Sequence, residues 1–161
     1  MIMHKAKLYL LLLSGCLVFS GAAGGEIVRD CDLISQARLE GAMNPQLVWA
    51  VANIESSKNG KARNGTHYGL MQLKLGTARM MGFRGKPKEL LNWKLNLGYG
   101  SRYLNEQMRR YRSKTAALAA YNAGAAFPCK KTHTGCKVGG FVNQNYVEMV
   151  MRKYRQKPVQ C

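Results

Sequence analysis

Apolar side chains in the middle of the chain recur at the spacing of an α-helix. The residues that share this face, three or four positions apart, are Leu47, Val48, Val51 and Ile54. Asn44 followed by Pro45 precedes them, and an Asn cap with Pro in the first turn is a typical helix start. We therefore predict an apolar helix that begins at about residue 45 and has Glu55 in its last turn.

The same spacing predicts further helices. One at roughly 96–111 carries Leu97, Leu104, Met108 and Tyr111. Ser113 stands at the N-cap position of an Ala-rich helix at about 114–122. A final helix at about 144–155 carries Val147, Val150, Met151 and Tyr154.

The segments between these helices are rich in turn-forming residues. Residues 56–67 are polar and contain Gly60 and Asn64-Gly65, while residues 124–140 hold a proline, two cysteines and four glycines. No alternating strand pattern of useful length appears. The predicted fold class is all-α, a compact domain with at most a small β-like turn near residues 64–73.

The N-terminal stretch has the pattern of a secretory signal peptide. A basic start is followed by the apolar run Leu8–Phe19 and then by the small residues Ser20-Gly21-Ala22-Ala23. The run is shorter than the roughly 20 residues of a membrane-spanning helix. We therefore expect residues 1–23 to be removed on export, which leaves a single catalytic domain at 24–161, in the periplasm or secreted.

A second processing route stays open. Leu13-Ser14-Gly15-Cys16 is similar to a lipoprotein processing site, which would anchor the chain through a lipid on Cys16. Apolar residues continue after it through Leu17-Val18-Phe19, where a lipoprotein usually turns polar, so ordinary cleavage is favoured.

Either route leaves four cysteines, which outside the cytoplasm indicate two disulfides with three possible connectivities. We favour a short loop closed by Cys129 and Cys136, and a bridge from Cys31 to Cys161 that ties the two ends together. A zinc site that uses His133 is the alternative, but a fourth ligand at suitable spacing is missing. No metal is therefore expected.

The chain is strongly basic, with 25 Lys and Arg against 8 Asp and Glu, a net charge of +17. Such a charge favours an anionic partner: nucleic acid, an anionic lipid surface or an acidic polymer. Export disfavours nucleic acid and fits the carboxylates of peptidoglycan. A solvated basic surface without a specific partner is the alternative.

Glu55 differs from the other acidic residues, which lie near the new N-terminus or among polar neighbours. It follows the apolar segment 47–54, so burial disfavours its ionised form, as does the negative end of the helix dipole. Both effects raise the pKa of the carboxyl, as a general acid near neutral pH requires. The alternative is a Glu that merely ends a helix in water.

Other chemistries have little support. Once His4 leaves with the leader, only His67 and His133 remain, too few for a histidine-rich metal centre. No phosphate-binding glycine-rich loop appears, and cysteines held in disulfides are unavailable as nucleophiles. No cofactor is expected.

From Glu55 onward the sequence resembles the soluble-type (SLT, family 1) lytic transglycosylases. The matching motifs occur in order over residues 45–155: Glu55-Ser56, Gly69-Leu70-Met71-Gln72, Asn96-Leu97 with Gly100 and Tyr103-Leu104, Ala120-Tyr121-Asn122-Ala123-Gly124, and Tyr146-Val147. One such motif would be weak evidence, but five in order are specific. The resemblance implies a lysozyme-like α-helical fold with a cleft for alternating N-acetylmuramic acid and N-acetylglucosamine.

The resemblance also implies roles for individual residues. Glu55 would act as acid and then as base, and Ser56 would fix the catalytic turn. Gly69 belongs to the matched motif, and Met71 with Gln72 would line the sugar cleft. Tyr121 would hydrogen-bond near the Glu55 carboxylate, supported by Asn122, with Tyr146 closing the site. Ser56, Met71 and Tyr146 also have purely structural readings, as a helix end, a core residue and a packed aromatic residue.

The function that this resemblance implies is a glycan lyase that cleaves the β-1,4 bond between MurNAc and GlcNAc and leaves 1,6-anhydro-MurNAc ends. The alternatives are a hydrolytic muramidase similar to goose-type lysozyme and a non-catalytic cationic wall-binding module. The matched segments contain no second carboxylate, and Glu106 and Glu148 are the remaining candidates for a hydrolytic base. The expected partners are peptidoglycan strands, with an envelope-spanning secretion or pilus machine as a further candidate. We expect a monomer and no nucleic acid.

The sequence departs from the family pattern in two places. The loop between Glu55 and Gly69 carries Asn59-Gly60 and Asn64-Gly65 in place of the usual Asn-Pro and Ser-Pro elements. The segment from Cys129 to Cys136 looks like an addition. Both border the expected cleft, so they bear on substrate preference rather than on the class of reaction.

Overall fold

The computed structural model describes residues 25–130 and 139–156. Helix α2, Pro45–Ser56, begins where the sequence predicts, because the Asn44 side chain accepts a hydrogen bond from the backbone N–H of Leu47 at 3.0 Å. Residues 47–52 of this helix are all buried. Helix α2 therefore forms the centre of the fold, with the predicted apolar face turned into the core.

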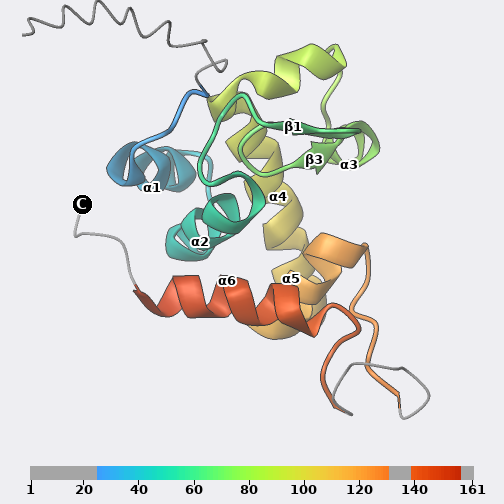
Figure 1. Ribbon diagram of the computed structural model, residues 1–161. Helices are drawn as coiled ribbons and strands as arrows, with labels where there is room; N and C mark the ends of the chain where they lie inside the picture. The colour runs from blue at the N-terminus through green and yellow to red at the C-terminus, as the bar shows by residue number, and fades with distance from the viewer. Residues whose placement is uncertain (1–24, 131–138, 157–161) are drawn as a thin grey trace, which may run out of the picture.

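Four other helices surround α2 and together with it form what we call the helical scaffold. They are α1 (Asp30–Leu39), α4 (Trp93–Tyr111), α5 (Lys114–Ala123) and α6 (Gln144–Gln156). Helix α2 packs against α1 and α6, and α5 packs against both α4 and α6 (Figure 1). The helices α4, α5 and α6 correspond to the three predicted after α2.

The ends of these helices follow from local capping. Helix α4 begins three residues earlier than predicted, since the Asn92 side chain accepts hydrogen bonds from the N–H groups of Lys94 and Leu95. Ser113 caps α5 as predicted, and α5 ends at Gly124, whose φ of +82° suits a left-handed C-cap. Local chemistry thus sets the bounds of the helices, while burial sets their orientation.

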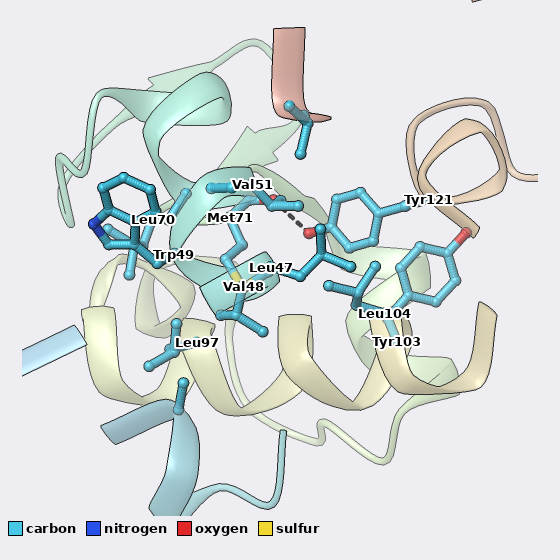
Figure 2. Packing of buried hydrophobic residues seen from close by; sticks show 14 of the residues in the cluster. Leu47, Val48, Trp49, Val51, Leu70, Met71, Leu97, Tyr103, Leu104 and Tyr121 are labelled. Carbon is cyan, nitrogen blue, oxygen red and sulfur yellow. Dashed lines mark hydrogen bonds between the residues drawn. The ribbon is translucent and has the colours of Figure 1, made fainter. Parts of the chain in front are cut away.

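The core lies where α2, α4 and α5 meet the segment that follows α2 (Figure 2). Helix α2 contributes Leu47, Val48 and Val51, and α4 contributes Leu97 and Leu104. Among the described helices, none combines the length and the apolar composition that a membrane crossing needs.

Residues 57–92, which we call the β lobe, lie between α2 and α4 in the sequence. They form an antiparallel sheet of strands β1 (Arg63–Asn64), β2 (His67–Tyr68) and β3 (Leu73–Lys74), followed by α3 (Leu75–Met80) and the 3₁₀ helix η1 (Pro87–Leu91). The sheet and α3 sit together at one side of the molecule, beyond α2 and α4 (Figure 1). The predicted β-like turn near 64–73 is therefore a small three-stranded sheet.

Three short elements are absent from the sequence prediction: α1, α3 and η1. Helix α1 buries only Leu33, Ile34 and Ala37, which is too sparse a pattern to stand out along the chain. Helix α3 has six residues and η1 has five, both too short for periodicity to show. The fold class itself, α-helical with a very small β element, is confirmed.

The 124–140 loop is held at its base by backbone hydrogen bonds. Cys129 N–H donates to the Gly140 carbonyl at 2.9 Å, and Val142 N–H donates to the Phe127 carbonyl at 3.0 Å. Cys31 and Cys129 are each disulfide-bonded. Their favoured partners, Cys161 and Cys136, lie outside the described residues, as do the leader and Cys16, so these pairings stay predictions.

Candidate active site

Glu55 occupies the last turn of α2, where the buried helix meets the β lobe. The residue is half-buried, and its carboxyl lines a cleft of about 320 Å³. Residues of both the scaffold and the β lobe form its wall. They are Glu55, His67, Gln72, Leu73, Lys74, Thr77, Tyr103, Tyr121, Asn122, Ala123 and Gly124. The cleft thus lies at the junction of the helical scaffold and the β lobe.

Two opposing effects act on the Glu55 carboxyl. Burial raises its pKa, and a hydrogen bond from the Tyr146 hydroxyl to Oε1, at 2.7 Å, lowers it. Burial is the larger effect, so the pKa of Glu55 is raised above its ordinary value. The prediction of a raised pKa from burial is therefore matched by the geometry. One carboxyl oxygen is fixed by Tyr146, while the other is not engaged by that bond.

Tyr146 reaches Glu55 because α6 packs across α2. It lies in the first turn of α6 and is buried. Burial and the neighbouring Glu55 charge raise the pKa of the Tyr146 phenol well above its usual range, so the hydroxyl remains a hydrogen-bond donor. The sequence assigned Tyr146 a closing role, and the structure places it as the direct partner of the carboxyl.

Ser56 links the end of α2 to the β lobe. Its hydroxyl oxygen lies 2.7 Å from the Leu70 carbonyl oxygen and 3.2 Å from that of Ala52. The Leu70 contact crosses from the helix to the β lobe, directly beside Glu55. Ser56 therefore does more than end a helix, because it fixes the acidic residue against the segment that forms one wall of the cleft.

The turn from Gly69 to Gln72 forms that wall. Gly69 has a φ of +70°, and a Cβ there would lie 2.3 Å from the Leu90 carbonyl oxygen, so the position requires glycine. Gln72 also has a positive φ, of +48°, and its side-chain Nε2 donates to the Gly69 carbonyl at 2.8 Å. Gln72 lines the cleft as predicted, while Gly69 shapes the turn behind it.

Met71 occupies the core position that its structural interpretation from the sequence predicts. Its side chain is fully buried in the core and is not part of the cleft wall (Figure 2). Its backbone connects the two regions: Met71 N–H donates to Oδ1 of Asn96 at 2.8 Å, and its carbonyl accepts from Tyr121 at 2.8 Å. An apolar residue in a motif next to the site is thus a core residue.

Tyr121 lines the cleft near Glu55, where burial and, as the smaller cause, the Glu55 charge raise the pKa of its phenol. The hydroxyl donates to the Met71 carbonyl (Figure 2), and the Glu55 carboxyl is bound by Tyr146. Asn122 also lines the cleft, and its Oδ1 accepts a hydrogen bond from Asn143 at 2.9 Å rather than supporting Tyr121. Tyr121 therefore braces the β lobe against α5.

Several cleft residues were not singled out from the sequence. His67 and Lys74 come from paired strands, and Thr77 lies in α3. Tyr103 belonged to the matched helix motif but had no assigned role. The sequence holds no periodic signal for the first three, because strands of two residues and the six-residue helix α3 are too short to show a repeat.

Among the cleft-wall residues that the structure describes, Glu55 is the sole carboxylate. Glu106 on α4 and Glu148 on α6, the candidate hydrolytic bases, are exposed and do not line the cleft. Within the described ranges, no cluster of three or more His, Cys, Asp or Glu side chains is arranged to hold a metal ion. The chemistry of this cleft therefore centres on one acid.

Comparisons with known proteins identify relatives of this fold. Two solved structures share the fold: the lytic transglycosylase Slt of Pseudomonas aeruginosa, an inactive mutant, and the 70 kDa soluble lytic transglycosylase SLT70 of Escherichia coli. The first is 21% identical with a TM-score of 0.63, over 79% of this chain and 23% of that one. The second is 22% identical with a TM-score of 0.53, over 78% of this chain and 18% of that one.

This chain therefore spans only about a fifth of the length of these two enzymes. The family model described as the transglycosylase SLT domain matches residues 32–135, which include Glu55, the turn at Gly69 and the Tyr121 segment. That match covers well over half of the chain and confirms the resemblance drawn from the motifs. The chain belongs to the transglycosylase SLT domain family.

Proposed function

We propose that this protein is a peptidoglycan lytic transglycosylase that cuts the β-1,4 bond between MurNAc and GlcNAc and leaves 1,6-anhydro-MurNAc ends. The observation that carries the proposal is the single carboxylate of the cleft: Glu55, half-buried and hydrogen-bonded to Tyr146. The family match and the fold of the two related enzymes support the same class of reaction.

In the first step, Glu55 acts as a general acid. Burial raises the pKa of its carboxyl and so favours the protonated form, and it gives this proton to the glycosidic oxygen as the bond to the muramic acid C1 breaks. The bond from Tyr146 stabilises the carboxylate that results. Burial and this bond together let one group be both an adequate acid and an adequate base.

In the second step, the substrate supplies what a second carboxylate supplies in ordinary glycosidases. Those enzymes use paired carboxylates at about 5–5.5 Å when retaining and roughly 6.5–9.5 Å when inverting. With one carboxylate in the cleft, the carbonyl oxygen of the substrate's own N-acetyl group stabilises the positive charge that develops at C1. Glu55, now a base, takes the proton of the 6-hydroxyl, whose oxygen attacks C1 and closes the anhydro ring.

Glu106 and Glu148 are exposed and do not line the cleft, so neither is placed to activate water there. This observation disfavours a hydrolytic muramidase. A purely binding module has no use for a half-buried acid bound by a buried tyrosine. Export to the periplasm, which the N-terminal pattern predicts, would bring the protein to this substrate.

The deciding experiment is mass spectrometry of the sugars released from purified cell wall. Anhydro-muramic ends as the major product would support the proposal. Reducing muramic ends would contradict it and favour hydrolysis, and a failure to lyse wall embedded in a gel would favour the binding module. The Glu55→Gln variant serves as the blank for contaminating activity.

A further inference from the structure

The β-lobe wall of the cleft carries two basic side chains that the proposed reaction does not use, His67 and Lys74. They are direct partners across the β2–β3 ladder. Residues paired in this way project from the same face of a sheet, with Cβ atoms about 4.5–5.5 Å apart. Two nitrogen-bearing side chains therefore stand together in the cleft that also holds Glu55.

Within residues 25–130 and 139–156, the Lys74 ammonium forms no salt bridge. It is exposed, and the salt bridges formed among the described residues, Arg29–Asp32, Lys58–Asp30 and Lys61–Glu26, all lie elsewhere. The only carboxyl in the cleft wall, Glu55, is engaged by Tyr146. A lysine ammonium that lines a ligand cleft and has no salt-bridge partner within the protein favours the binding of an anionic ligand.

One nitrogen of the His67 ring contacts a backbone carbonyl of the neighbouring strand. This nitrogen, Nδ1, lies 3.3 Å from the Asn64 carbonyl oxygen, and a carbonyl only accepts, so Nδ1 is the donor in that contact. Nε2 is the ring nitrogen that this contact leaves free.

The surroundings have the same sign of charge. The β lobe, residues 57–92, contains eight Lys and Arg against one acidic residue, Glu89. All of the eight except Lys58 are exposed. The field over this wall of the cleft therefore attracts anionic groups.

We propose that Lys74, with His67 beside it, binds a carboxylate of the glycan substrate. This inference rests on the proposed function, because it names the part of the peptidoglycan that this wall recognises. Two sources carry the same chemistry: the lactyl carboxylate of a muramic acid without its stem peptide, and the carboxylates of the stem peptide where one is attached.

The test is a kinetic comparison of soluble glycan fragments with and without stem peptides, each also prepared with its carboxylates converted to neutral methylamides. Lys74→Met should raise KM about tenfold on a carboxylate-bearing fragment and leave kcat within about twofold. A tenfold change is about 1.4 kcal/mol of binding free energy. Lys74→Arg should retain most of the affinity, because it keeps the charge.

Two matched controls isolate the charge. Lys88→Met removes an equally exposed lysine of the β lobe outside the cleft wall, and should leave KM unchanged. On the neutral methylamides, wild type and Lys74→Met should be alike. A Lys74 effect on peptide-free fragments identifies the lactyl carboxylate, and an effect confined to peptide-bearing fragments identifies the stem. Equal KM values for Lys74→Met and wild type on every fragment overturn the proposal.

Direct binding separates this inference from the proposed function. In the Glu55→Gln background, calorimetric titration with the same fragments should show about tenfold weaker binding when Lys74→Met is added. If wild type cuts no fragment but this charge-dependent binding persists, the proposed function fails and the carboxylate site stands. If wild type cuts and binding is independent of Lys74, the function stands and the site is refuted.

Discussion

In the helical scaffold, each helix buries a face of apolar side chains, and α2 alone buries six consecutive residues, 47–52. In the β lobe, each strand has two residues, and hydrogen bonds from the scaffold supply much of the order. Asn96 on α4 is the main donor and acceptor: it bonds Met71 N–H, the Tyr68 carbonyl and the Leu90 carbonyl at 2.7–3.0 Å. The scaffold is held mainly by burial, whereas the lobe combines buried residues such as Leu70 and Leu90 with specific polar contacts to α4.

This difference has a consequence for the site. Glu55 and Tyr146 both stand on scaffold helices, whereas the cleft-wall residues Gln72 and Lys74 stand on the lobe. In the mechanism that we propose, the acid therefore stands on the helical scaffold and the carboxylate-binding residues on the β lobe. Substitutions in the scaffold and in the β lobe should therefore have different effects on activity and on stability.

The largest effect is expected on the scaffold side, at Glu55→Gln. The amide keeps the shape of the side chain but has no proton to transfer, so turnover should fall roughly 10²–10⁴-fold, the range that general acid–base catalysis contributes. Wall lysis and circular dichroism measure activity and fold together. Glu106→Gln and Glu148→Gln are matched controls, since both acids are exposed outside the cleft. Loss of activity in either control would contradict the single-carboxylate reading.

The next largest effect, on stability, is expected for Asn96→Ala. We call the three hydrogen bonds of Asn96 to the β lobe the latch between the two regions. Asn96 is fully buried, and its loss leaves one donor and two acceptors unpaired, at about 1–3 kcal/mol each for a buried polar group. We expect a loss of roughly 3–5 kcal/mol in the free energy of unfolding, with faster amide exchange concentrated in residues 57–92.

Asn105→Ala is the matched control for this latch. Asn105 lies on the same helix and is also buried, but it bonds Met43 N–H and the Gly41 carbonyl, between α1 and α2. Its loss should destabilise the protein without singling out the β lobe in amide exchange. If both variants loosen the lobe equally, Asn96 is not a specific latch.

A smaller effect is expected for Tyr146→Phe. The Tyr146 hydroxyl lowers the pKa of Glu55, so its removal should raise that pKa further. The limb of the pH–rate profile where the acid loses its proton should then move to higher pH, while kcat falls about tenfold, as for a lost hydrogen bond to a charged group. Tyr154→Phe on the same helix is the control, because its hydroxyl bonds Asn44 far from the cleft. A shift in the opposite direction would refute the assigned role.

The smallest effect is a difference in stability between alanine substitutions at two glycines of α4, Gly100 and Gly98. A Cβ at Gly100 would lie 2.9 Å from the Cβ of Met71, so Gly100→Ala should press on the lobe and cost about 1–2 kcal/mol. A Cβ at Gly98 would meet only the end of the flexible Glu40 side chain, at 2.6 Å. Gly98→Ala should therefore be neutral or slightly stabilising, as alanine is the better helix former. Thermal melting of the two variants gives the comparison, and equal losses would contradict it.

The sequence predicts the scaffold better than the lobe for the same physical reason. Helix α2 and its acid follow from signals within a few residues, namely the Asn44 cap and the apolar spacing up to Glu55. Asn96 gives no such signal, since a buried amide looks like any polar position until its three partners are in place. Lys74 faces the cleft only because of the strand register that pairs it with His67. For Met71 the sequence leaves two readings open, because a motif position does not say which way a side chain points.

Under the proposed function the substrate is cell wall, and the charge of the β lobe should affect how the protein moves over it. Cell wall is an insoluble network, so each encounter is a search along a surface rather than a collision in solution. The seven exposed basic residues of the lobe should retain the protein near an anionic wall between cuts, over a range set by the Debye length, about 8 Å at physiological ionic strength. Raising the salt concentration should therefore shorten the residence time of the protein on wall fragments and raise its dissociation rate. Surface-binding kinetics would show this change.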